Sequence, residues 1–217
     1  IKNITKSENV FYMPPLYPIP SVNFGFVPFK EISSKEITIF LHHSSWNQKT
    51  TISSDRFIHK ELLIINQLIN KGYKIKLNIL MYNEEEMLLN CTFNCTNIKH
   101  IYSNKCSYKD IIKLIQDSDI CITNGSPVFG GNCLTDIISL GKPLIYIGDG
   151  RLGIEWTFDF PNYLYKQKEI REDYLIYIQE DDIKSTEKID KILNNLSKFH
   201  NMCSDLIKDY DFYNWKN

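Results

Sequence analysis

The chain has 217 residues, of which 43% are hydrophobic, and its formal net charge is −1. This length fits one large domain, or one and a half, with enough apolar side chains to bury a sizeable core. A near-neutral charge, with Lys and acidic residues interspersed, argues against a nucleic-acid partner, and no apolar run approaches the roughly 20 residues that a transmembrane helix needs.

The N-terminal segment is rich in proline. Five prolines fall within fifteen residues of the stretch FYMPPLYPIPSVNFGFVPFK, and proline is excluded from helix interiors and central strands because it lacks a backbone donor. We therefore predict that residues 1–35 form an extended linker or strap that packs across a core. Because the chain begins with Ile1 instead of Met, we also expect a processed product or a piece of a longer protein.

Strands alternate with helices from residue 36 onward. Short runs of β-branched and aromatic residues predict buried strands, over residues 36–43, 74–82, 98–103, 120–123, 143–148 and 174–179. Apolar side chains at helical spacing predict helices over residues 57–72, 84–90, 107–119 and 133–142, with one or two more within 185–217. The expected N-caps are Ser107 and one of Ser53, Ser54 and Asp55, and the expected C-terminal glycines are Gly72 and Gly141.

This alternation predicts an α/β fold: a doubly wound, Rossmann-like parallel sheet with helices on both faces. The strand segments are almost continuously apolar, as burial on both faces requires. We divide the chain into the strap over 1–35, a nucleotide-binding domain over 36–184, and C-terminal helices over 185–217. The C-terminal helices either pack on this domain or cross from it to another one.

The cysteines are compatible with a reduced, cytoplasmic protein. Their even number would suit disulfides, but a chain of this length does not need them for stability. Cys121 lies inside an apolar strand, where a free thiol behaves as a small hydrophobe. Cys91 and Cys95 have no matching Cys or His pair at zinc spacing, so we expect no metal site. A peripheral attachment to a membrane is left open.

A glycine-rich turn follows the predicted strand over 120–123, at the end of a parallel strand where ligands collect. Its glycines permit close approach of the backbone to a ligand, and the helix that opens near Asn132 presents free N–H groups to the turn. This arrangement binds a diphosphate without a cation. The predicted ligand contacts are Asn124, Gly125, Ser126, Gly130, Gly131, Asn132, Thr135 and Asp136, the last two toward a ribose or sugar hydroxyl. An ordinary turn and N-cap is the alternative interpretation.

A second polar loop, HHSSWNQKTTISS, follows the strand over 36–43. Lys49 could neutralise a phosphate as a point charge, and Ser44 and Asn47 offer hydrogen-bond donors. His42 and His43 end the strand side by side, so at most one of them faces the cleft. We select His43, which adjoins the loop, and Lys49 as the candidate catalytic residues. A structural role at the strand end is the alternative for the histidine.

The segment YKDIIKLIQDSDICITNGSPVFGGNCLTDIISLGKPLIYIGDG resembles the sugar-nucleotide half of glycosyltransferases with the GT-B fold. It is most similar to the family of O-linked N-acetylglucosamine transferases and bacterial protein N-glycosyltransferases. Asp136 and the step Gly141-Lys142-Pro143 keep that family's spacing, and Lys49 takes the position of a lysine that meets the diphosphate. The chain departs from the family at the helix start, where Gly131 and its successors replace a His and paired threonines.

This resemblance implies that the chain binds a nucleoside-diphosphate sugar, with uridine as the expected base, and transfers the glycosyl group to a protein or glycan acceptor. It implies no metal or other cofactor. It also implies a missing partner, because a GT-B enzyme has two such domains. We therefore expect an N-terminal domain or partner subunit that contributes the acceptor site.

Two other functions remain open. Polyol-phosphate transferases of the teichoic-acid type carry a similar strand and KPxI step, although DICITNGSP lacks their acidic residue after Thr123. Alternatively, the chain is a non-catalytic adaptor module that has lost the ligand site. Cytidine nucleotides would bind in the first case, and no nucleotide sugar in the second.

Overall fold

The computed structural model describes residues 27–32, 35–42, 51–81, 95, 97–102, 105–125, 133, 136–137, 139–148 and 175–201. Six strands in this part of the chain form one sheet in the order β3-β2-β1-β4-β5-β6, and every neighbouring pair is parallel. The strands are β1 (Glu36–His42), β2 (Lys74–Met81), β3 (Asn97–Tyr102), β4 (Ile120–Gly125), β5 (Leu144–Gly148) and β6 (Leu175–Tyr177). All six predicted strands are confirmed, with ends that differ by at most two residues.

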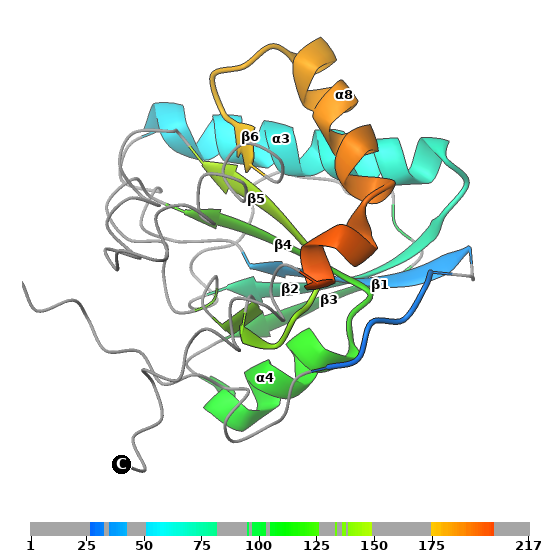
Figure 1. The fold of residues 1–217 in the computed structure, drawn as a ribbon. Helices are drawn as coiled ribbons and strands as arrows, with labels where there is room; N and C mark the ends of the chain where they lie inside the picture. The colour runs from blue at the N-terminus through cyan, green and yellow to red at the C-terminus, as the bar shows by residue number, and fades with distance from the viewer. Residues whose placement is uncertain are drawn as a thin grey trace, which may run out of the picture.

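Helices cover both faces of this sheet, as predicted. Figure 1 shows α3 (Thr51–Asn70) and α8 (Asp182–Leu193) over one face and α4 (Tyr108–Asp117) on the opposite one. Residues 133, 136, 137 and 139 are helical and lie between β4 and β5 in the chain, and residues 196–201 form a further helical turn after α8. The chain is therefore an α/β protein with a doubly wound, Rossmann-like sheet.

The core is sandwiched between these layers. Every residue of β5 is buried, and the central part of β1 is buried on both of its sides. Such strands suit a sheet that is covered on both faces, because neither side chain direction leads to water. Helix α3 contributes buried apolar side chains from its inner face, among them Phe57 and Ile64. Within the described residues, no helix has the length and apolar character to cross a membrane.

Three of the predicted helix ends are confirmed. Ser107 caps α4 in a capping box, in which its hydroxyl accepts from the amide of Asp110 and the Asp110 carboxylate accepts from the amide of Ser107. Gly72 and Gly141 have positive φ angles of 85° and 71°, as expected for the residue after a helix end. The predicted cap for the helix before Gly72 is wrong, because α3 already begins at Thr51 and includes Ser53, Ser54 and Asp55.

Gly72 allows a direct test of this backbone requirement. The amide of Gly72 donates to the carbonyl of Ile69, and that of Tyr73 to the carbonyl of Leu68, which closes α3 in a Schellman motif. A Cβ at Gly72 would meet no atom within 4 Å, so only the backbone opposes a side chain there. We expect Gly72→Ala to lower the free energy of unfolding by about 1 kcal/mol, as measured by urea denaturation. Gly72→Asn should cost less, because asparagine tolerates this conformation; an equal or larger loss would contradict the explanation.

The ends of the chain are only partly described. Residues 1–26 and the predicted helix over 84–90 lie outside the described residues. The end of the predicted strap lies against the core, since the amide of Val27 donates to the carbonyl of Leu140 and the ring of Phe29 contacts that of His200. Helix α8 begins at Asp182, three residues before the expected start of the C-terminal helices. Its buried face packs against α3, so this helix belongs to the same core.

Candidate functional site

The strand order creates a switch point between β1 and β4. From β1 the chain moves through α3 to β2 on one side, whereas from β4 it moves to β5 on the other side. The two strands are neighbours, and their paired residues run to His42 and Thr123 near the carboxyl ends. Ligands of open parallel sheets bind outside the carboxyl ends at such a point, because the diverging connections leave a crevice there.

The two polar loops predicted from the sequence leave the sheet from these two strands. One follows His42 at the end of β1, and the other follows Gly125 at the end of β4. Most predicted site residues lie outside the described residues, namely His43, Ser44, Asn47, Lys49, Ser126, Gly130, Gly131, Asn132 and Thr135. Asn124, Gly125 and Asp136 are described. The fold thus brings the strands that carry both loops together, while the loop contacts stay predictions.

His42 and Thr123 contact each other across the switch point. Their register pairs them directly, and Nδ1 of His42 lies 3.0 Å from Oγ1 of Thr123. Thr123 is buried and His42 is half-buried. His42 therefore lies at the junction of β1 and β4, and its neighbour His43 lies outside the described residues. The choice of His43 as a catalytic residue remains a prediction.

Asn124 is buried, and its side chain is directed toward α3. Its Nδ2 donates to Oε1 of Glu61 at 2.5 Å, and both residues are almost fully inaccessible, with exposures of 2% and 0%. Because successive residues of a strand point to opposite faces, Asn124 faces α3 whereas Thr123 faces the other side of the sheet. The sequence predicts Asn124 as a ligand contact, and the structure adds a partner that the sequence did not suggest.

Asp136 is also buried, beneath the first turn of α4. The hydroxyl of Tyr108 donates to Oδ1 of Asp136 at 2.8 Å, and only 5% of Asp136 is exposed. Burial raises the pKa of Asp136 to about 7, against a smaller opposite effect of the Tyr108 hydrogen bond. Partial burial of Tyr108 and the nearby carboxylate of Asp136 raise the pKa of the Tyr108 hydroxyl. The predicted contact of Asp136 with a ribose or sugar hydroxyl is not tested by this geometry.

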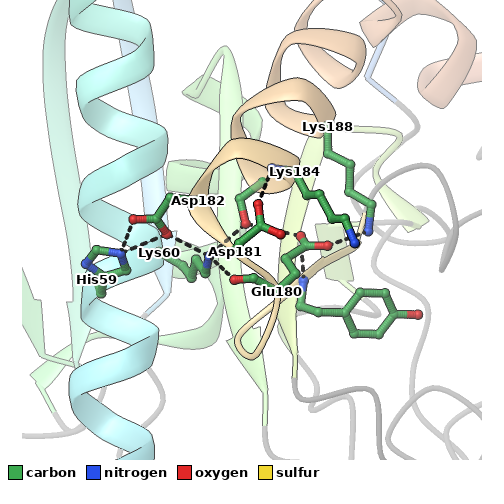
Figure 2. A network of polar contacts seen from close by, with 9 residues as sticks. His59, Lys60, Glu180, Asp181, Asp182, Lys184 and Lys188 are labelled. Atoms are coloured by element: carbon green, nitrogen blue, oxygen red, sulfur yellow. Dashed lines mark hydrogen bonds and ion pairs between the residues drawn. The ribbon is translucent and has the colours of Figure 1, made fainter.

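A separate polar cluster joins α3 to the start of α8 (Figure 2). Lys60 is 2% exposed, and its Nζ donates to the carbonyl of Glu180, to Oδ1 of Asp182 and to the hydroxyl of Ser185, at 2.7 to 3.0 Å. An ammonium group has three donors, so these three acceptors satisfy it completely. The cluster is internally paired and lies between helices, which indicates that it fastens α8 to α3.

The outer part of this cluster is more exposed. Nε2 of His59 lies within 2.9 Å of both carboxylate oxygens of Asp182, and Nζ of Lys188 lies 3.1 Å from Oε2 of Glu180. Asp181 caps α8 by accepting from the amide of Lys184. The acidic start of α8 is thereby held by cations from α3 and from α8 itself, and the acid at the helix start also suits the helix dipole.

Within the described part of the chain, no group of three or more His, Cys, Asp or Glu side chains is placed to hold a metal ion. Four described cysteines are free thiols, namely Cys95, Cys106, Cys121 and Cys133. Cys121 is fully buried in β4, as predicted, and burial raises the pKa of its thiol to about 12. Such a thiol stays protonated and acts as a packing residue.

Sequence reasoning missed Lys60 and Glu61, although a signal for them exists. The apolar stripe of α3 includes Phe57, Ile64 and Leu68, and both charged residues stand at helical spacing from these positions. A charged residue inside an apolar stripe must either reach water or find a buried partner. The sequence alone therefore indicates that the charged residues 60 and 61 need polar partners, but it does not indicate which elements supply them.

Comparisons with known proteins do not assign a family. No protein-family model matches the chain, and no curated protein sequence matches it either. Among solved structures, the chain is similar to a rubredoxin:oxygen oxidoreductase from the anaerobe Desulfovibrio gigas, with 11% sequence identity and a TM-score of 0.37. The similarity covers 76% of this chain and only 37% of that protein. No function is transferred at this level of similarity.

Proposed function

We propose that the chain is the donor-binding domain of a glycosyltransferase, which binds a nucleoside-diphosphate sugar at the carboxyl ends of β1 and β4. The observation that carries the proposal is the adjacency of these two strands at the switch point. The glycine-rich turn and the lysine-bearing loop, which lie far apart in the sequence, begin at neighbouring strand ends. The resemblance of these two segments to GT-B glycosyltransferases supplies the reaction.

The chemistry would be electrostatic. Transfer of a glycosyl group leaves negative charge on the departing diphosphate, and fixed donors aimed at that charge lower the barrier. Residues 133, 136, 137 and 139 are helical and follow the predicted glycine-rich turn in the chain. The free amides expected at the start of that helix, together with Lys49, would provide these donors. Uridine diphosphate is the expected leaving group. In this proposal a second domain or subunit binds the protein or glycan acceptor and contributes the base that activates it.

Binding of uridine diphosphate tests the proposal most directly. We expect the nucleotide to raise the melting temperature, because a ligand present at 100 times its Kd stabilises the folded state by about 2.7 kcal/mol. Lys49→Ala should weaken the affinity measured by calorimetry about tenfold, since a charge-assisted contact contributes roughly 1.5 kcal/mol or more. Lys74→Ala is the matched control, because Lys74 is exposed at the start of β2, far along the strand from the carboxyl edge.

Other results would redirect the assignment. Binding of cytidine diphosphate in preference to uridine diphosphate would favour a polyol-phosphate transferase. A chain that binds neither nucleotide nor any nucleotide sugar would contradict the proposal and favour an adaptor. If Lys49→Ala and Lys74→Ala changed the affinity equally, Lys49 would not be part of the site, although the chain would still bind the nucleotide.

A further inference from the structure

The hydrogen bond between Glu61 and Asn124 connects the carriers of both candidate ligand loops. Helix α3 begins at Thr51, directly after the lysine-bearing loop, and Glu61 lies on its third turn. Asn124 is the penultimate residue of β4, next to Gly125 and the glycine-rich turn. Oε1 of Glu61 accepts from Nδ2 of Asn124 at 2.5 Å. This contact therefore ties α3, which follows the lysine-bearing loop, to β4, which precedes the glycine-rich turn.

A second contact acts on the other face of the sheet. His42 and Thr123 join the ends of β1 and β4 through Nδ1 and Oγ1 at 3.0 Å. Thr123 and Asn124 are consecutive, so the end of β4 is held to β1 by one side chain and to α3 by the next. Backbone pairing alone already fixes β4 within the sheet. The two side-chain contacts further fix the position of the end of β4 relative to β1 and to α3.

Stability gives little reason for a carboxylate at this position. Glu61 and Asn124 have exposures of 0% and 2%, so folding removes both polar groups from water. The hydrogen bond offsets that desolvation only in part, and well-packed apolar side chains of similar volume often serve a core equally well or better. Ile64, one turn along α3, and Ile147, the partner of Asn124 in β5, are both fully buried apolar residues. A buried acid and amide are better explained by the fixed direction of their hydrogen bond than by its net energy.

We propose that Glu61 is a positioning residue for the nucleotide site: its bond to Asn124 holds the end of β4 and the start of α3 in the arrangement that lets both loops bind one ligand. This inference rests on the proposed nucleotide-binding function. Glu61 acts on the site through its bond to Asn124. Removal of the bond should therefore weaken ligand binding more than it weakens the fold.

Exchange of the two side-chain types provides the test. Asn124→Asp sets two carboxylates against each other, and we expect the affinity for uridine diphosphate to fall at least about tenfold. Glu61→Gln keeps an amide oxygen that can accept from Asn124, so its affinity should stay within about threefold of the wild type. The double variant Glu61→Gln/Asn124→Asp restores an acid–amide pair with reversed polarity. Its affinity should recover to within about threefold of the wild type, which a direct repulsion between the carboxylate introduced on β4 and the ligand would prevent.

Two comparisons separate positioning from stability. Lys60→Met changes the neighbouring buried charge of α3, whose partners lie at α8, and should lower the free energy of unfolding without changing nucleotide affinity. If Asn124→Asp does not fold, Glu61→Met takes its place in the series. Glu61→Met removes the acceptor of the hydrogen bond without adding a like charge. If the wild type binds nucleotide and Asn124→Asp, or Glu61→Met in its place, loses stability but no affinity, positioning is refuted. Positioning is also refuted if the double variant does not recover. A wild type that binds no nucleotide refutes the proposed function, and this inference with it.

Discussion

Asp136→Asn is expected to increase the free energy of unfolding at pH 8 by up to roughly 4 kcal/mol and to leave it almost unchanged at pH 4. The estimate follows from the pKa of Asp136, which burial raises from an ordinary 3.8 to about 7, at 1.36 kcal/mol for each pKa unit. Asparagine keeps an acceptor for the hydroxyl of Tyr108 and carries no charge that would have to be buried.

The sign of this effect depends on which state of the protein binds the proton more tightly. Between about pH 4 and pH 7 the folded chain holds a proton on Asp136 that the unfolded chain has released. The contribution of Asp136 to stability is therefore fully present below about pH 4, falls as the pH rises, and is lost above about pH 7. The wild type should lose stability over this range relative to Asp136→Asn.

Urea denaturation of both proteins at several pH values between 4 and 8 measures this difference. Asp110→Asn provides a control of opposite sign, because its contacts with Ser107 lower the pKa of the exposed Asp110 carboxyl. The stability that Asp110 contributes should be lost as the pH falls below its ordinary pKa of 3.8, so the series for this control extends to more acidic pH. Parallel stability curves for the wild type and Asp136→Asn would show that Asp136 titrates normally and is not desolvated.

Lys60→Met should lower the free energy of unfolding by about 2 to 3 kcal/mol. The substitution keeps the volume of the aliphatic side chain but removes the cation that reaches the carbonyl of Glu180, the carboxylate of Asp182 and the hydroxyl of Ser185. Loss of one partner of a buried ion pair costs roughly 3 to 5 kcal/mol. The expected loss is smaller here, because Asp182 is half exposed and regains hydration.

His59→Ala is the matched control for Lys60→Met. His59 contacts the same Asp182 carboxylate, but its side chain is 57% exposed, so the loss should stay below about 1 kcal/mol. Chemical denaturation at pH 7 compares the two variants directly. If His59→Ala lowered the free energy of unfolding as much as Lys60→Met, exposed charge pairs would account for the contribution of the acidic start of α8. The buried ammonium group of Lys60 would then add no stability beyond that of an exposed pair.

The sheet was predictable because its signals are local. Apolar runs such as EITIFLHH and PLIYIG stand between amphipathic segments, and the alternation alone determines a parallel, doubly wound fold. Ser107 and Gly72 likewise mark helix ends through interactions with their own neighbours in the chain. The start of α3 was not predictable in this way, since Ser53, Ser54 and Asp55 suit a cap equally well but continue the helix.

The candidate site was predictable only in part. The strand ends that carry its loops follow from the fold, but the pairs His42–Thr123, Glu61–Asn124 and Tyr108–Asp136 join residues that are 81, 63 and 28 positions apart. Such contacts depend on how strands and helices pack, which no local pattern encodes. Asp136 illustrates the limit: its place in the helix after the glycine-rich turn was expected, whereas its burial against α4 was not.

The adjacent charges Lys60 and Glu61 have a consequence for the assembly of the fold. Consecutive helical residues are separated by about 100° around the axis, and here one of them meets the acidic start of α8 while the other meets an amide of β4. If α3 docked with its axis rotated by one residue, Glu61 would take the place of Lys60 and face the carbonyl of Glu180 and the carboxylate of Asp182. That arrangement would bring two carboxylates together and leave Lys60 without its acceptors. The two side chains therefore favour a single rotational setting of α3 about its axis.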